Sequence, residues 1–139
     1  MTVGHQEKVY DLEERTYLFA ARTRRFVKRM PRTIGNIEDG KQLVKSSGSV
    51  GANYIEANEA LSDRDFLMRV RISRKEAKES RYWLRLIDLE SKTDLESERV
   101  SLIQESEELT RILSAILRNK SQTGCAGNPK TQAPNPKPK

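Results

Sequence analysis

The sequence has few of the residues that usually carry catalysis or cross-links. Its 139 residues include one cysteine and one histidine, so no internal disulfide can form, and we interpret Cys125 as incidental. No apolar run approaches the roughly 20 residues that cross a bilayer, and the first residues lack the apolar core of a signal peptide, which predicts a cytoplasmic protein. Aromatic residues make up only 6%, which argues against a β-sandwich or barrel.

Charge, in contrast, is abundant. Charged residues form 33% of the chain and the net charge is +6, which permits attraction to nucleic acid or another polyanion. The length fits a single domain with a modest core.

Apolar and small residues recur at steps of three and four, which predicts four amphipathic helices over about 11–30, 36–60, 62–89 and 94–119. Short connections favour antiparallel neighbours, so we expect an all-α, up-down-up-down antiparallel four-helix bundle over residues 8–120. Pro31 should end the first helix, and Asn36 and Ser62 are the expected N-caps of the second and third. The residues expected to face the core are Leu12, Thr16, Phe19, Thr23, Phe26, Met30, Leu43, Ser47, Val50, Tyr54, Ala57, Leu61, Phe66, Val70, Ser73, Ala77, Ser80, Leu84, Ile87, Leu95, Leu102, Ser106, Leu109, Leu113 and Ile116.

Residues 121–139 differ in composition from the rest. They contain four of the five prolines and no large apolar residue, which predicts a disordered Pro/Lys-rich tail. We favour an uninvolved, solvated tail over one whose lysines contact a polyanion.

The stretch SSGSVGANYIEANEA, residues 46–60, places small and polar residues in a predicted helix. Gly48 and Gly51 lie on one ridge with Ile55, and because glycine destabilises a helix interior, the ridge predicts close approach of another helix. Asn53 and Glu56 lie on a polar ridge with Ser46 and Ser49. Their spacing lets the amide and the carboxylate satisfy each other, so we interpret the pair as structural rather than catalytic.

An enzyme is not predicted. Glu56, Glu76 and Glu79 could imitate a carboxylate-bridged metal site, but such bundles also need a Glu-x-x-His motif, and His5 lies outside the predicted helices. The sequence also lacks a nucleophile elbow and a glycine-rich phosphate loop. We therefore expect no catalytic residues, metal or cofactor.

The third predicted helix has an apolar line apart from its core stripe, formed by Met68, Ile72, Trp83 and Leu86. We favour a subunit interface there. A wide core stripe with ordinary exposed apolar side chains is the alternative.

Basic residues gather on the first and third predicted helices and could contact the phosphates of a nucleic acid. The alternative, which the sequence leaves open, is a solvated surface partly neutralised by Glu96, Glu98, Glu105, Glu107 and Glu108 of the fourth helix. The candidate nucleic-acid-binding residues are Arg22, Arg25, Arg29, Arg71, Arg74, Lys75, Lys78, Arg81 and Arg85.

The segments GKQLVKSSGSVGANYIEANEA, DF and SRKEAKESRYWLRL, in this order, resemble small bacterial four-helix-bundle proteins encoded by intervening sequences of 23S rRNA genes. The resemblance covers about residues 8–117 and implies a homopentamer. That family is similar to the accessory variability determinant proteins of diversity-generating retroelements, which bind a reverse transcriptase and nucleic acid and have no catalytic site.

The sequence thus predicts a non-enzymatic oligomer that binds RNA or a ribonucleoprotein through its basic helices. The resemblance adds a reverse transcriptase as a possible protein partner. A protein-interaction scaffold without direct nucleic-acid binding is the alternative, and a carboxylate-dependent enzyme is the third and least favoured hypothesis.

Overall fold

The computed structural model describes residues 12–127, with only the helical backbone given for 121–127. Within these residues it contains four α-helices and no strand, which confirms the all-α prediction. The helices are α2 (Leu12–Arg29), α3 (Ile34–Asn58), α4 (Asp63–Leu86) and α5 (Thr93–Gly127). Helix α5 continues past its predicted end near 119, so residues 121–127, which were predicted to belong to the disordered tail, have a helical backbone instead. The rest of the predicted disordered tail, residues 128–139, lies outside the described residues, as does His5.

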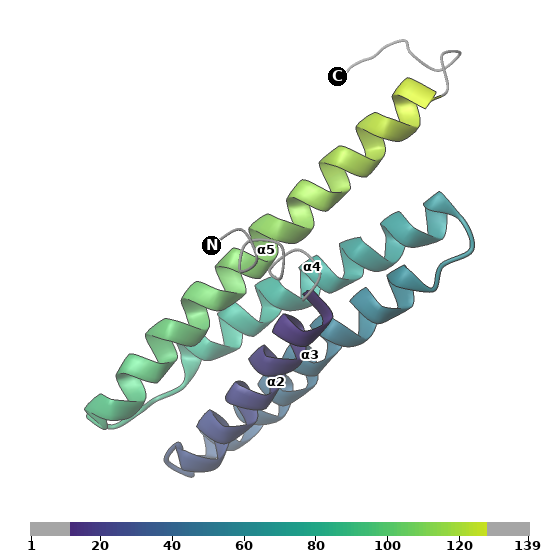
Figure 1. The fold of residues 1–139 in the computed structure, drawn as a ribbon. Coiled ribbons are helices and arrows are strands. Elements are labelled where there is room, and N and C mark those ends of the chain that lie inside the picture. The colour runs from purple at the N-terminus through teal and green to yellow at the C-terminus, as the bar shows by residue number, and fades with distance from the viewer. Residues whose placement is uncertain (1–11, 128–139) are drawn as a thin grey trace.

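Each helix packs beside two others, in the order α2, α3, α4, α5 and back to α2. Figure 1 shows successive helices joined at alternate ends of the molecule. Cross-helix contacts agree with this arrangement: Arg15 near the start of α2 reaches Glu105 well along α5, whereas Arg29 at the end of α2 reaches Asp94 at the start of α5. Helices α2 and α5 therefore run in opposite directions.

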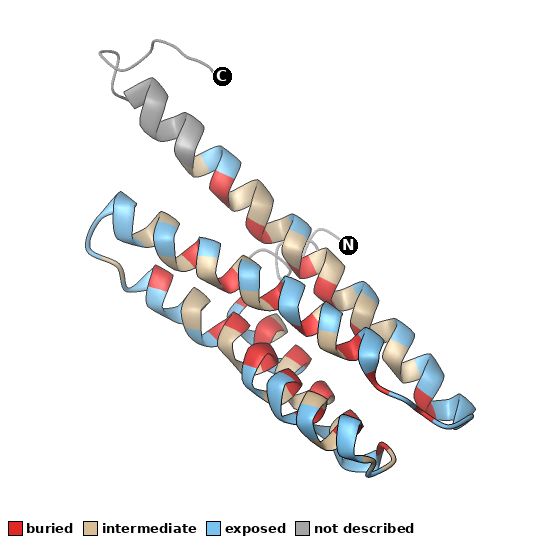
Figure 2. Ribbon diagram, turned by 180° about the vertical axis from the view of Figure 1, so that it is seen from behind, coloured by how far each residue is buried: buried red, intermediate tan, exposed pale blue. Residues whose placement is uncertain are grey.

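Buried residues recur on the inward side of every helix (Figure 2). The predicted stripe of α2 is buried along its whole length. Its residues are three or four positions apart, and a helix places residues with this spacing on one face. Tyr54, Phe66 and Ile116 are half-buried and pack against the core. Leu61 was predicted wrongly: it is 98% exposed because it follows the last turn of α3. The buried polar side chains are Thr16, Thr23, Asn36, Ser46, Ser47, Ser73, Ser80 and Ser106.

The N-cap of α3 differs from the prediction. The side chain of Thr33, not Asn36, accepts the hydrogen bond that caps the helix, and its donor is the Asn36 backbone N–H at 3.0 Å. Asn36 itself is buried, and its side chain bonds to the backbone of two loops. The cap of α4 was predicted correctly, since Ser62 accepts from the Asp65 N–H at 3.1 Å.

Helix α4 ends at Leu86, about three residues before the predicted end. The guanidinium of Arg99 on α5 donates to the carbonyl oxygens of Leu84, at 3.2 Å, and Ile87, so carbonyls at the end of α4 have a partner from the next helix. The chain then turns through Glu90 and Ser91, whose φ angles of 53° and 72° are left-handed. Such a turn cannot continue a right-handed helix.

Candidate nucleic-acid interface

The glycine ridge of α3 faces α2. A Cβ added to Gly51 would lie 2.7 Å from Oγ1 of Thr16, and one added to Gly48 would lie 3.1 Å from Nη2 of Arg24. The two helices thus approach closely where the glycines are, as the sequence predicted. Ile55, which was assigned to the same ridge, is instead 48% exposed.

The polar ridge of α3 faces α4. The Arg69 guanidinium donates to Oδ1 of Asn53 at 3.2 Å, while Nδ2 of Asn53 donates to the Ser49 carbonyl at 2.9 Å. Ser46 and Ser80 share a buried hydroxyl–hydroxyl hydrogen bond of 2.9 Å. Asn53 therefore links α3 to α4. The expected bond between Asn53 and Glu56 is absent from the described contacts, and Glu56 is exposed.

The three carboxylates considered for a metal site do not converge. Glu76 and Glu79 line one small pocket with Ser46 and Ser49, whereas Glu56 lies about two helical turns beyond Ser49. Among the described side chains, no group of three or more histidine, cysteine or acidic residues is arranged to hold a metal ion.

The predicted apolar line on α4 divides into two groups. Met68 and Leu86 are 46% and 47% exposed, but they lie near opposite ends of the helix. Ile72 and Trp83 are half-buried and about 16 Å apart along the axis, and Trp83 packs against the core. The line is therefore not one continuous exposed strip.

Helix α5 neutralises part of the predicted basic surface. Arg22 pairs with Glu98 at 3.3 Å and Arg29 pairs with Asp94. The third pair, between Arg81 and Glu107, is 2.6 Å long and joins α4 to α5. These three arginines hold helices together, which matches the alternative of an acidic fourth helix screening basic neighbours.

Hydrogen bonds between arginines and carboxylates shift the pKa values of three groups. Hydrogen bonding to Glu105 raises the pKa of the Arg15 guanidinium, an effect that burial opposes. The hydrogen bond from Arg29 lowers the pKa of the Asp94 carboxyl, and that from Arg99 lowers the pKa of Glu96.

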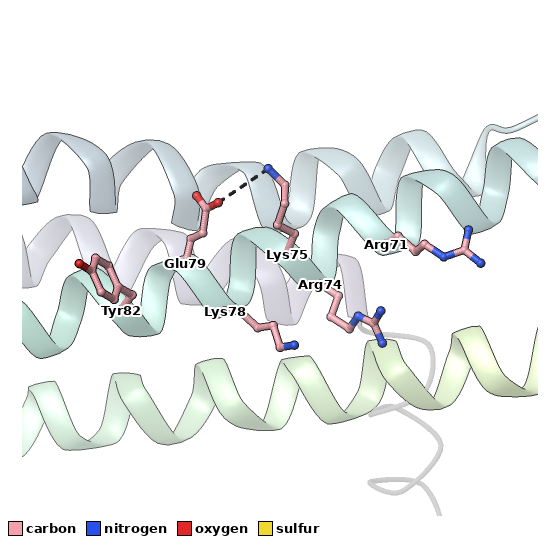
Figure 3. Close-up of a pocket in the computed structure, with 6 residues that line it drawn as sticks. All are labelled: Arg71, Arg74, Lys75, Lys78, Glu79 and Tyr82. Carbon is pink, nitrogen blue, oxygen red and sulfur yellow. Dashed lines mark ion pairs between the residues drawn. The ribbon is translucent and has the colours of Figure 1, made fainter.

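The outer side of α4 keeps an open cationic pocket of about 320 Å³ (Figure 3). We call it the α4 pocket. In Figure 3, Tyr82 stands at one end and Arg71 at the other, with Arg74 and Lys78 on the side toward α5. The pocket is lined by Arg71, Arg74, Lys75, Lys78, Glu79 and Tyr82.

Most of the charge in the α4 pocket is available for a ligand. Arg71 and Lys78 are exposed and make no ion pair with any described residue. Among the described residues, Arg74 donates only to the neutral Ser114 hydroxyl, at 3.2 Å. Lys75 is partly neutralised by Glu76 and Glu79, at 3.4 and 3.8 Å.

Two further candidates lie apart from this group. Arg85 is exposed but does not line the α4 pocket. Arg25 lines a second pocket of about 330 Å³ beside α5, whose lining also includes Arg29, Asp94 and Glu98. Tyr82 was missed among the predicted site residues. Its position four residues after Lys78, on the same helix face, is the signal that could have identified it.

No described helix combines the length and the apolar character needed to cross a membrane. Cys125 lies in the part of α5 whose side chains are not described.

Comparison with known proteins agrees with this architecture. A crystal structure of a protein of unknown function from the S23 ribosomal protein family of Bacteroides thetaiotaomicron is 28% identical, with a TM-score of 0.65. The alignment covers 76% of this chain and 96% of that one. No curated protein matches the chain. The family model for 23S rRNA-intervening sequence proteins matches residues 8–115, and the chain therefore belongs to the 23S rRNA-intervening sequence protein family.

Proposed function

We propose that this protein is a non-enzymatic RNA-binding protein that contacts phosphates through the α4 pocket. The observation that carries the proposal is the presence of Arg71, Arg74 and Lys78 in one open pocket without an acidic partner among the described residues. Elsewhere on the described surface, α5 carboxylates pair with Arg15, Arg22, Arg29 and Arg81. Uncompensated cations that share a surface attract a polyanion and release its counterions on binding.

The names of the matches support RNA as the polyanion. The family is named for an intervening sequence of 23S rRNA, and the similar crystal structure is assigned to a ribosomal protein family. Neither name mentions a retroelement, so a reverse-transcriptase partner remains a prediction of the resemblance, as does the cytoplasmic location.

The test is a salt series with a structured RNA and a variant that lacks two of the free cations. Each phosphate contact contributes about 0.7–0.9 to the slope of log affinity against log salt concentration. Replacing Arg71 and Lys78 with alanine should therefore weaken binding and reduce the slope by about 1.4–1.8. A control variant with alanine at the exposed residues Lys28 and Lys41 has the same net charge as the Arg71/Lys78 variant. It should bind RNA as the unaltered protein does.

Affinity that does not respond to salt would contradict the proposal. So would an equal loss in the control variant, because the effect would then come from net charge rather than from the α4 pocket.

We further propose that the chain assembles as a homo-oligomer of up-down-up-down bundles, with the pentamer implied by the family resemblance as the expected state. Exposed apolar side chains support self-association: Ile34 is 84% exposed, and Met68 and Leu86 are about half exposed. Mass determination in solution tests the subunit number, and a monomer would overturn this part of the proposal.

A protein-interaction scaffold is the second candidate, and the same exposed apolar residues favour it. Purified protein that stays oligomeric but carries no nucleic acid, and that does not bind RNA even at low salt, would favour the scaffold. Co-purifying RNA that is lost in the Arg71/Lys78 variant would favour the RNA-binding function.

A further inference from the structure

The α4 pocket contains an aromatic ring that phosphate binding alone does not use. Tyr82 lines the pocket beside its cations and is 54% exposed. Lone exposed tyrosines are common on protein surfaces, but this one shares a pocket with four cationic side chains. A ring next to cations offers two kinds of contact to a nucleotide, one with the base and one with the phosphate.

The ring of Tyr82 packs against that of Trp83. The two rings form a T-shaped pair with centroids 5.0 Å apart and an interplanar angle of 78°. Trp83 is half-buried and packs against the core of the bundle. An aromatic pair of this geometry is energetically favourable. Tyr82 thus makes a favourable ring contact while more than half of its surface stays open to solvent.

Charge is distributed unevenly along the pocket. Glu79 is three residues before Tyr82, and in Figure 3 both lie toward the end away from Arg71. A carboxylate disfavours a phosphate at that end, but it can accept a hydrogen bond from a base amino group or a ribose hydroxyl. Arg71 and Arg74 lie further along, about 12–16 Å from Tyr82 by helical rise, where phosphates are favoured.

We propose that the α4 pocket binds single-stranded RNA, with an unpaired base stacked on Tyr82, an adjoining phosphate near Lys78, and phosphates further along the strand on Arg74 and Arg71. This inference rests on the proposed RNA-binding function and adds the class of RNA. In an A-form duplex the base faces are already stacked on one another, so a duplex could use the cations but not the ring. Bases in loops and single strands are free to stack on an aromatic side chain.

The experiment compares one labelled RNA oligonucleotide as a single strand and as a duplex with its complement, using the full chain at moderate salt. The unaltered protein should prefer the single strand. Tyr82→Ala should weaken single-strand binding by about 5- to 150-fold, the range for loss of one base-aromatic stack, and should leave duplex binding unchanged. Tyr82→Phe keeps the ring and should bind as the unaltered protein does.

Two more variants test whether misfolding, or the loss of any exposed tyrosine, could explain the result. Tyr82→Leu keeps an apolar side chain against Trp83 but removes the aromatic face, so it should lose the single-strand preference even if the alanine variant folds poorly. Tyr17→Ala removes a tyrosine that is 64% exposed on α2, and it should have no effect on RNA binding.

The outcomes separate the two proposals. If the Arg71/Lys78 alanine variant binds both RNAs as before, the proposed function fails. If that variant loses affinity but Tyr82→Ala and Tyr82→Leu still prefer the single strand, the function stands and the stacking site is overturned. Equal losses for Tyr82→Phe and Tyr82→Ala would also overturn stacking, because the hydroxyl would then be the group that matters.

Discussion

The side-chain amide of Asn36 pairs with the backbone of Asp88, a residue 52 positions away. Nδ2 of Asn36 donates to the Asp88 carbonyl at 2.8 Å, and Oδ1 accepts from the Asp88 N–H at 2.9 Å. The same Nδ2 also donates to the carbonyl of Pro31 at 2.8 Å. One buried side chain thus joins the α2–α3 connection to the α4–α5 connection at the same end of the bundle.

Replacing Asn36 with alanine should lower the free energy of unfolding by about 2–4 kcal/mol, because it leaves up to three backbone groups without their partner. Urea denaturation monitored by circular dichroism measures the change. Asn58→Ala is the matched control, since Asn58 makes one exposed hydrogen bond, to Glu13. It should cost less than about 1 kcal/mol. Similar losses for both variants would mean that the amide does not join the two loops.

Replacing Gly51 with alanine should destabilise the protein by about 1–2 kcal/mol, although alanine favours a helix over glycine. The new Cβ would lie 2.7 Å from Oγ1 of Thr16 and would push α2 away from α3. Gly35→Ala is the control, because nothing lies within 4 Å of its added Cβ. That variant should be stabilised by as much as about 1 kcal/mol. Thermal melts of the two variants should therefore shift in opposite directions.

Replacing Thr23 with valine should stabilise the protein by about 1 kcal/mol. The Thr23 hydroxyl is fully buried and has no hydrogen-bond partner among the described atoms, so valine removes an unsatisfied polar group at nearly constant volume. In Thr16→Val, by contrast, a hydrogen bond of 2.9 Å to the Glu13 carbonyl is lost, and stability should fall. A destabilised Thr23→Val would indicate that the hydroxyl has a partner after all.

Acidification should remove a small contribution from the pair between Arg29 and Asp94. The hydrogen bond from Arg29 lowers the pKa of the Asp94 carboxyl in the folded state. A depressed carboxyl pKa stabilises the fold above the unfolded-state pKa of about 3.9, and this contribution is lost as the pH falls through the lower, folded-state pKa. Both side chains are more than half exposed, so the effect should be modest.

The measurement is the free energy of unfolding of the unaltered protein and of Asp94→Asn between pH 7 and pH 2.5. The difference between the two proteins should be present at pH 7 and shrink below about pH 4. A difference that does not change with pH would mean that Arg29 does not favour the ionised carboxylate.

The sequence alone predicted the four helices and most of their buried residues. The stripe from Leu12 to Met30 repeats at three- and four-residue steps, and a helix places such residues on one face whatever packs against it. Gly51 was also informative, because a glycine in a helix interior is unfavourable unless another chain segment needs the space. These features depend on neighbours within a few turns of one helix.

Long-range pairing could not be predicted in the same way. Arg81 and Lys78 are both basic residues on one turn of α4, yet Arg81 is bound by Glu107 and Lys78 has no acidic partner among the described side chains. The difference depends on which side of α4 meets α5. Leu61 likewise fits the apolar spacing of α3 but follows its last turn, so it has no core to enter.

What the sequence determined by itself is therefore the local geometry: four amphipathic helices, the inward face of each, and the cap at Ser62. Only the tertiary structure decided which cations remain free, that Asn36 bonds to two loops instead of capping a helix, and that Tyr82 shares a pocket with Arg71. The physical reason is the separation along the chain over which each kind of interaction acts. Helical periodicity acts over three or four residues, whereas ion pairs, buried hydrogen bonds and pockets depend on how whole helices are placed beside one another.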